Sequence, residues 1–344
     1  MQHLFALLTL TLTAALLLPT TSATAEQAGG VVNIYSSRHY DSDDKLFTQF
    51  TEATGIKINL IEGKADELLA RIKREGDLSP ADLFITVDAG RLHLAVEAGV
   101  LQPISSPTLN DRIPENLRHP QGLWFGLSQR VRCIFLSNTV EPDYVTTYAE
   151  LADPRLDRGL LIRSSSNIYN QSLLASLIAN QGTSATQAWA NGVVNNMARR
   201  PQGGDTDQLR ALAAGEGEVA VANHYYYARM IAGSSASDKM AASKIRIVFP
   251  DQNGRGAHVN VSGAGVLKTA SNKANAVKFL EFMTTPQAQT LWALENHEYP
   301  VIEGLPLTPV LQSFGMFKPD TLNASQLGNN NAEGKRVMDR AGWR

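Results

Sequence analysis

Apolar and polar positions in the first part of the chain alternate between the spacing of strands and that of helices. Strand-like apolar runs cover residues 31–37, 56–61 and 82–86, and the stretch after each run has helical spacing, most clearly over 65–75. This alternation predicts an α/β fold with a parallel sheet covered by helices on both faces. Ligands of such folds bind at the carboxyl ends of the strands, which is where residues 36–40 lie.

Two later segments are suited to connect separate lobes. Residues 123–134 are predicted to be extended and to cross from a first lobe to a second, and residues 254–266 are predicted to return to the first. The chain is too long for one small core, so we expect two lobes. The predicted N-terminal lobe comprises residues 26–130 and 256–306, and the predicted C-terminal lobe comprises residues 131–255 and 307–344.

The two ends of the chain are predicted to differ from the folded body. Residues 4–18 are almost entirely apolar and precede Ala23-Thr24-Ala25, a pattern that predicts a signal peptide over residues 1–25, cleaved after Ala25. The apolar run is shorter than the roughly 20 residues of a membrane span. No Lys or Arg precedes the run, which leaves a retained anchor as the alternative. We expect a periplasmic protein with a polar, only partly ordered tail around residues 329–331.

Composition excludes some classes of function. The chain has 31 Lys and Arg against 33 Asp and Glu, a formal net charge of −2, and no basic run, which argues against nucleic acid as a partner. The single cysteine, Cys133, cannot form an internal disulfide, and its strand-like surroundings predict burial. An exported enzyme is the alternative from another class, although the chain has no Gly-x-Ser-x-Gly or His-Glu-x-x-His motif.

Three consecutive tyrosines, Tyr225 to Tyr227, follow a small-residue strand over 217–222. They lie where a strand ends and a helix begins, and Arg229 lies one helical turn beyond Tyr225 and Tyr226. Phenols, whose ordinary pKa is near ~10, are poor bases at neutral pH. They become strong oxygen ligands when a highly charged cation displaces their protons. The alternative is aromatic packing at the edge of a core.

Five short motifs follow one another along the chain, at residues 32–40, 80–84, 167–170, 222–226 and 257–265. In this order they resemble the periplasmic ferric-iron-binding proteins of bacterial ABC importers, most closely the cyanobacterial FutA-like, iron-deficiency-induced branch. The resemblance covers nearly the whole mature chain. It implies a type II periplasmic-binding-protein fold, with two lobes that are joined by two hinge strands and close on one Fe(III) in the cleft between them. It also implies a monomer without enzymatic activity that delivers Fe(III) to an inner-membrane ABC permease.

The resemblance also implies a set of site residues. The expected metal ligands are His39, Tyr40, Tyr169, Tyr225 and Tyr226. Some relatives use the histidine as a ligand and others do not, so a loop hydrogen bond is the alternative for His39. Arg130 and Arg229 match cleft arginines that balance the phenolate charge, with structural ion pairing as their alternative. Tyr227 has no counterpart in the family pattern, so we expect it to pack in the core.

Chemistry supports the resemblance independently. Hard cations prefer oxygen ligands, and four phenolates around Fe³⁺ leave one net negative charge that nearby arginines stabilise. Other branches use a His and a Glu with a bound carbonate or phosphate. Tyr40 stands in their place here, so the binding of an anion stays open. The alternatives on the same fold are an oxyanion, a polyamine or thiamine as the bound solute.

Overall fold

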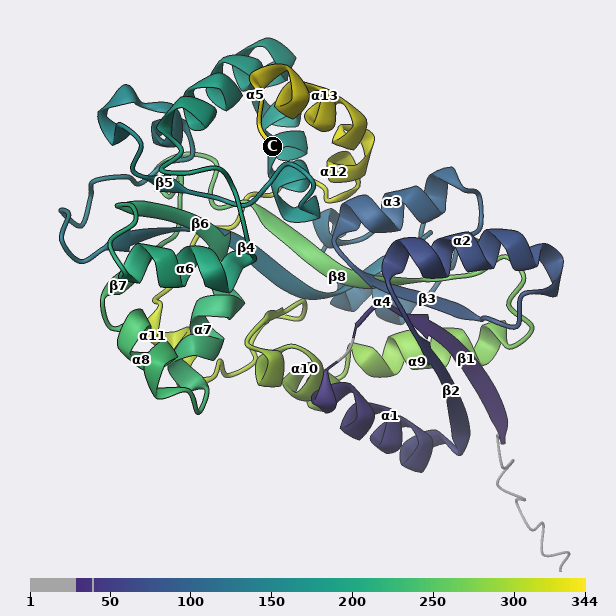
Figure 1. The fold of residues 1–344 in the computed structure, drawn as a ribbon. Coiled ribbons are helices and arrows are strands. Elements are labelled where there is room, and N and C mark those ends of the chain that lie inside the picture. The colour runs from purple at the N-terminus through teal and green to yellow at the C-terminus, as the bar shows by residue number, and fades with distance from the viewer. Residues whose placement is uncertain (1–28, 39) are drawn as a thin grey trace, which may run out of the picture.

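The computed structural model describes residues 29–38 and 40–344. The predicted signal peptide with its cleavage after Ala25, and His39, lie outside the described residues. Within the described part, nine strands form one sheet, in which seven follow one another in the order β2-β1-β3-β8-β4-β6-β5, while β7 and β9 pair with β4 outside this order (Figure 1). No helix there combines the length and apolar character needed to cross a bilayer.

The secondary structure follows the predicted alternation closely. The strands are β1 Gly30–Ser36, β2 Ile56–Glu62, β3 Leu83–Val87, β4 Phe125–Ser137, β5 Leu160–Leu161, β6 Val219–Asn223, β7 Ile245–Val248, β8 Val259–Val266 and β9 Tyr299–Pro300. The helices are α1 Asp41–Thr54, α2 Ala65–Glu75, α3 Ala89–Glu97, α4 Pro107–Arg112, α5 Ile168–Asn196, α6 Asp205–Ala213, α7 His224–Ala232, α8 Ala236–Ala242, α9 Lys273–Met283, α10 Pro286–Trp292, α11 Pro309–Ser313, α12 Ser325–Asn329 and α13 Asn331–Ala341.

The sheet is mixed, so the prediction of a parallel sheet is confirmed only in part. β1 pairs in parallel with β2 and β3, and β5 pairs in parallel with β6. β8 runs antiparallel to both β3 and β4, and β4 runs antiparallel to β6. The prediction was wrong for the middle of the sheet because β4 and β8 are far apart in the sequence, and local alternation does not reveal the direction of such a pairing.

β4 belongs to both halves of the sheet. Its residues 125–131 pair with β8, whereas its residues 132–136 pair with β6. Figure 1 shows β4 and β8 running across the middle of the molecule, between the part with β1 to β3 and the part with α5 to α8. We propose that the two lobes divide where β4 changes partners, near residues 130–131, and again just before β8, near residues 255–256.

Apolar side chains are buried on both sides of this crossing, and one apolar cluster continues from the first side to the second. On the first side, Phe47 and Phe50 of α1 lie 5.8 Å and 5.2 Å, between ring centres, from Phe279 of α9. On the second side, Trp189 of α5 lies 6.3 Å from Trp343. Buried aromatic pairs of this kind remove large apolar areas from water, which stabilises each lobe.

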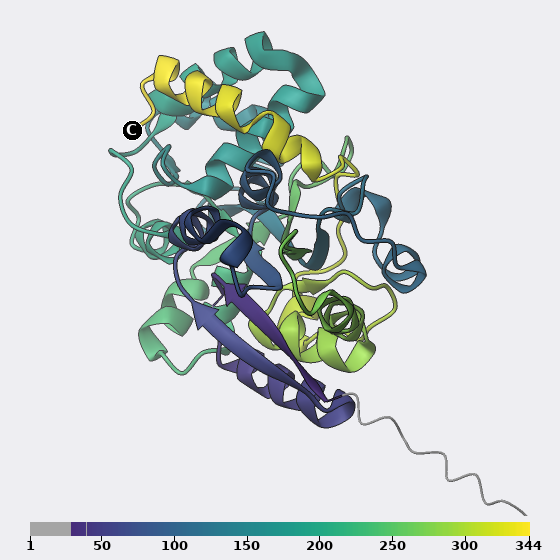
Figure 2. The same cartoon turned by 90° about the vertical axis from the view of Figure 1, so that its right-hand side faces the viewer.

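The C-terminal tail is ordered, and the expectation of partial order was wrong. Figures 1 and 2 both show α13 lying along α5. Trp343 is fully buried, and its indole Nε1 donates to the carbonyl of Arg163 at 2.9 Å. α12 packs against both α3 and α5, and the backbone N–H of Ala324 donates to the carbonyl of Asn116 at 2.8 Å. The run of asparagines predicts disorder, but apolar side chains before it, in α12, and after it, in α13, anchor the tail to both halves of the molecule.

Candidate metal site

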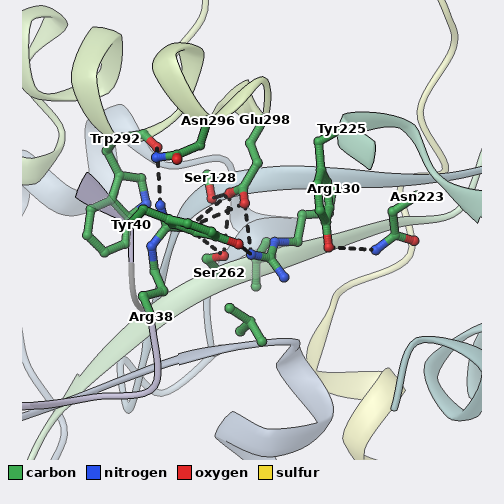
Figure 3. Close-up of polar contacts among 12 residues, drawn as sticks. Arg38, Tyr40, Ser128, Arg130, Asn223, Tyr225, Ser262, Trp292, Asn296 and Glu298 are labelled. Atoms are coloured by element: carbon green, nitrogen blue, oxygen red, sulfur yellow. Dashed lines mark hydrogen bonds and ion pairs between the residues drawn. The ribbon is translucent and has the colours of Figure 1, made fainter. Parts of the chain in front are cut away.

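Four tyrosines from three separate segments surround Arg130 on β4. Two guanidinium nitrogens of Arg130 donate to hydroxyls, Nη2 to that of Tyr40 and Nη1 to that of Tyr169, each at 3.4 Å. The guanidinium carbon of Arg130 also lies 5.1 Å from the ring centre of Tyr225. Figure 3 shows Arg130 between Tyr40 and Tyr225. The fourth tyrosine, Tyr226, packs against Tyr225 with its ring tilted by 35°, so the structure brings together the four tyrosines predicted from the sequence.

Two of the four tyrosines lie at the strand-to-helix junction that the sequence predicts. β6 ends at Asn223 and α7 begins at His224, which places Tyr225 and Tyr226 in the first turn of α7. Their ring centres are 4.4 Å apart, and Asn223 Nδ2 donates to the Tyr225 hydroxyl at 3.4 Å. Tyr225 is almost fully buried. The junction therefore holds two phenols side by side, as two ligands of one cation require.

Tyr169 is placed by the start of α5. The side-chain oxygen of Asn167 accepts a hydrogen bond from the backbone N–H of Asn170 at 3.3 Å, as an N-cap residue does. The helix therefore begins at Ile168 and carries Tyr169 in its first turn. The serines and asparagine that the sequence shows before α5 thus include the cap that fixes this tyrosine.

Arg229 confirms the predicted spacing of one helical turn. Its guanidinium carbon lies 5.0 Å from the ring centre of Tyr225 and 5.9 Å from that of Tyr226, on the same helix. It also lies 4.8 Å from the ring centre of Tyr40, which precedes α1 in the other half of the molecule. Arg130 and Arg229 therefore both face tyrosines from the two sides of the crossing, where positive charge favours phenolates.

The phenols of the site differ in acidity. Burial disfavours the Tyr40 phenolate, but the charges of Arg130, Arg38 and Arg229 outweigh burial and lower the pKa of Tyr40. Burial raises the pKa of Tyr225 well above its ordinary value, and the neighbouring Tyr169 raises it further. The same two causes raise the pKa of Tyr226. Tyr225 and Tyr226 therefore keep their protons at neutral pH until a cation displaces them.

Sequence reasoning missed Arg38 and Glu298. Arg38 is buried, and its guanidinium carbon lies 4.4 Å from the ring centre of Tyr40 and 3.8 Å from that of Trp292. Glu298 is fully buried and pairs with Arg130 at 2.8 Å and with Arg38 at 3.2 Å. Burial disfavours its charge, but the two arginines lower the pKa of Glu298 to about 2. Arg38 lies inside one of the recognised motifs, whereas no sequence signal connected it with Glu298.

The histidines described by the structure do not belong to any His, Cys, Asp or Glu group that could bind a metal. The described residues contain no group of three His, Cys, Asp or Glu side chains that could hold a metal. His224 accepts a hydrogen bond from the backbone N–H of Val131 at 3.1 Å, and burial lowers the pKa of His224 to about 4. Burial likewise lowers the pKa of His258 to about 3. The role of His39 stays a prediction, because it lies outside the described residues.

Tyr227 packs in the core, as predicted, and provides a test of specificity. Its buried hydroxyl donates to the carbonyls of Ala242 at 3.2 Å and Ile245 at 3.0 Å. We expect Tyr227→Phe to lower the free energy of unfolding by about 1–2 kcal/mol, measured by urea denaturation, because these hydrogen bonds are lost. The occupancy of the tyrosine site by a metal should stay at the wild-type value, and a loss of metal binding would contradict this division of roles.

Comparisons with known proteins show which family this chain is similar to. A family model described as bacterial extracellular solute-binding protein matches residues 79–314. The chain is 50% identical over 314 residues to iron uptake protein A1 of Synechocystis sp., covering 91% of this chain and 87% of that protein. It is 28% identical over 352 residues to the major ferric iron-binding protein of Neisseria meningitidis serogroup B, covering 99% of this chain and 98% of that protein.

Solved structures are similar over nearly the same length. The Trichodesmium IdiA (FutA) protein in complex with iron and citrate matches with a TM-score of 0.90 and 54% identity, covering 92% of this chain and 100% of that chain. The ferric binding protein from Campylobacter jejuni matches with a TM-score of 0.85 and 38% identity, covering 91% of this chain and 100% of that chain. The predicted two-lobed α/β fold is therefore confirmed.

Proposed function

This chain belongs to the bacterial extracellular solute-binding proteins, and from its tyrosine cluster we propose that it captures Fe(III) in the periplasm for uptake through an inner-membrane ABC permease. The observation that carries the proposal is the convergence of three tyrosines on Arg130 from both sides of the strand crossing, with Tyr226 beside the third of them, Tyr225. The similarity to iron uptake and ferric iron-binding proteins supports the same cargo. We propose that the exported chain acts as a monomer after cleavage behind Ala25.

The proposed ligands are the phenolates of Tyr40, Tyr169, Tyr225 and Tyr226, with His39 as a further candidate. Ferric iron is a small, highly charged cation that prefers oxygen donors. Four phenolates and Fe³⁺ leave one negative charge. Adding Arg38, Arg130 and Arg229, together with the buried carboxylates of Asp43 and Glu298, brings the loaded site close to neutrality. A nearly neutral buried site avoids the high cost of an unpaired charge.

The arginines also help to decide between Fe(III) and the alternative solutes. A polyamine or thiamine is a cation that cannot displace phenolic protons, and three guanidinium groups beside the tyrosine rings would repel it. An oxyanion would bind the arginines but would leave four clustered phenols without a role. The tyrosine cluster therefore favours a cation that converts phenols into phenolates. Release would follow from rotation of the two lobes about β4 and β8.

The direct test is a titration of apo-protein with ferric citrate, followed by visible absorption. Coordination of Fe(III) by phenolates produces a charge-transfer band, which should grow and then saturate at one equivalent of iron. Absence of the band from verified apo-protein would overturn the proposed site. Oxyanions and polyamines would then be screened by their effect on thermal unfolding, since a solute that binds the native state raises its stability.

Iron affinity should rise steeply with pH. Because burial raises the pKa of Tyr225 and Tyr226, their protons are still bound in the apo-protein and are released when Fe(III) binds. Each released proton adds roughly one unit to the slope of log affinity against pH, so we expect a slope of roughly two to four between about pH 5 and 7. The charge-transfer band, with citrate protonation measured separately, gives the slope. A pH-independent affinity would contradict phenolate coordination.

A substitution of Cys133 distinguishes an iron-binding protein from an enzyme that depends on a thiol. The side chain is fully buried, and burial raises the pKa of its thiol well above the ordinary value. We expect Cys133→Ser to leave the iron stoichiometry and the charge-transfer band at their wild-type values. A stability loss of about 1–3 kcal/mol is expected, because a hydroxyl replaces a buried thiol. Loss of the band in a folded variant would contradict the proposed independence of Cys133.

A further inference from the structure

We infer that Glu298 is a positioning residue for Fe(III) capture, whose buried carboxylate holds Arg38 and Arg130 against the phenol of Tyr40. This inference rests on the proposed function. Glu298 does not belong to the tyrosine cluster and carries none of the proposed donor atoms. It acts on the cluster through the two guanidinium groups that it binds.

The distances show which partner fixes Arg130. Arg130 Nη2 donates to Glu298 Oε1 at 2.8 Å, whereas its hydrogen bonds to the hydroxyls of Tyr40 and Tyr169 are both 3.4 Å long. A hydrogen bond of normal length between a guanidinium and a carboxylate, which carry opposite charges, is stronger than a long hydrogen bond from the guanidinium to a neutral phenol. The carboxylate therefore sets the position of the guanidinium, and the phenols adapt to it.

The same carboxylate also fixes Arg38. Arg38 Nη1 donates to Glu298 Oε2 at 3.2 Å, and the guanidinium is held between the rings of Tyr40 and Trp292. Figure 3 shows Glu298 connected by dashed lines to Arg38, Arg130 and two serines, with Tyr40 beside them. One buried side chain thus binds two of the three cations that flank Tyr40.

Glu298 also forms hydrogen bonds with both strands that join the lobes. Ser128 on β4 donates to Glu298 Oε2, and Ser262 on β8 donates to the same oxygen at 3.5 Å. Ser128 and Ser262 face one another in the pairing of β4 with β8. Arg130, two residues after Ser128, reaches tyrosines from both halves of the molecule. The carboxylate at this crossing therefore positions Arg130 toward Tyr40 of one half and Tyr169 of the other.

The charge of Glu298 gives a second reason to expect that this residue affects the bound Fe(III). With Glu298 charged, the loaded site is close to neutral, so removing this carboxylate leaves one uncompensated positive charge beside a phenolate. That charge lowers the energy of the phenolate electrons, so the charge-transfer band should shift. A residue that served only to stabilise the fold would change the unfolding transition and leave the band where it is.

The test compares Glu298→Gln with Glu295→Gln in full-length mature protein loaded with ferric citrate. Gln keeps the size of Glu but removes its charge, and Glu295 is a partly exposed carboxylate in the same segment, paired with Lys45 on the surface. The two readouts are the position of the band and the rate of iron release to excess EDTA. We expect Glu298→Gln to shift the band and speed release by about tenfold, comparable to the loss of one charge-assisted hydrogen bond. Glu295→Gln should match the wild type.

A milder variant keeps the inference testable if Glu298→Gln does not fold. Ser128→Ala removes one hydrogen bond to Glu298 without touching the arginines, and it should shift the band in the same direction by a smaller amount. A wild-type band and release rate in both folded variants, or in Ser128→Ala when Glu298→Gln is unfolded, would overturn the inference. Absence of the band from the wild-type protein would instead overturn the proposed function, and this inference with it.

Discussion

Tyr225→Phe and Tyr226→Phe should each lose most of their affinity for Fe(III) while keeping the native fold. Both side chains lie in the first turn of α7 with their ring centres 4.4 Å apart, so each phenylalanine removes one oxygen donor and little else. Mutation of a residue that hydrogen-bonds a metal ligand typically lowers metal affinity by about 10–100-fold. Loss of a ligand itself should therefore lower the affinity on the order of a hundredfold or more. Competition with citrate, followed by the charge-transfer band, measures the change.

Tyr227→Phe is the matched control, because it makes the same substitution at the next position of the same helix. Its hydroxyl donates to backbone carbonyls of the core, away from the cluster. Circular dichroism and thermal unfolding would establish that all three variants are folded. Wild-type affinity in both Tyr225→Phe and Tyr226→Phe would refute the assignment of this pair as ligands.

Asp205→Asn should produce the largest loss of stability among the single substitutions considered for the second lobe. Asp205 is buried at the start of α6, where it pairs with Arg132 and, at 2.8 Å, with Arg163. It also accepts a hydrogen bond from the backbone N–H of Asn223 at 2.9 Å. Removing one partner of a buried ion pair typically costs about 3–5 kcal/mol, because the other charge is left buried without compensation.

Urea denaturation followed by tryptophan fluorescence measures this loss. Trp189 and Trp343, which are both buried in the second lobe, report on its unfolding. Asp238→Asn is the matched control, because Asp238 pairs with Arg210 at 2.8 Å on the surface, where such pairs are worth at most about 1 kcal/mol. Equal effects of the two substitutions would show that burial does not govern the strength of the Asp205 pairs.

The Asp205 network should also affect the metal site. Asn223 accepts a hydrogen bond from Arg132 and donates its backbone N–H to Asp205. The side chain of the same asparagine donates to the Tyr225 hydroxyl. A folded Asp205→Asn protein is therefore expected to bind iron more weakly than the wild type. The stability of the second lobe and the placement of its ligands depend on the same buried charges.

The sequence by itself determined the local structure of the site. The small-residue strand before Tyr225, the Asn167 cap before Tyr169 and the helical spacing of Arg229 are each properties of a few neighbouring residues, and the structure contains the strand, the cap and the contact of Arg229 with the tyrosines. Such patterns act locally, because strand alternation, helix capping and one-turn spacing depend on short-range backbone geometry. The resemblance to ferric-iron-binding proteins added the grouping of the four tyrosines.

Only the tertiary structure decided how distant segments meet. The antiparallel pairing of β4 with β8, the anchoring of the tail by Trp343 and the contact of Glu298 with Arg38 and Arg130 all join segments far apart in the chain. In the sequence, Glu298 cannot be told from a surface carboxylate, because the charge of a buried acid is stabilised by partners that local patterns do not reveal. The physical reason is that burial and ion pairing depend on the whole fold, whereas spacing and capping depend on adjacent residues.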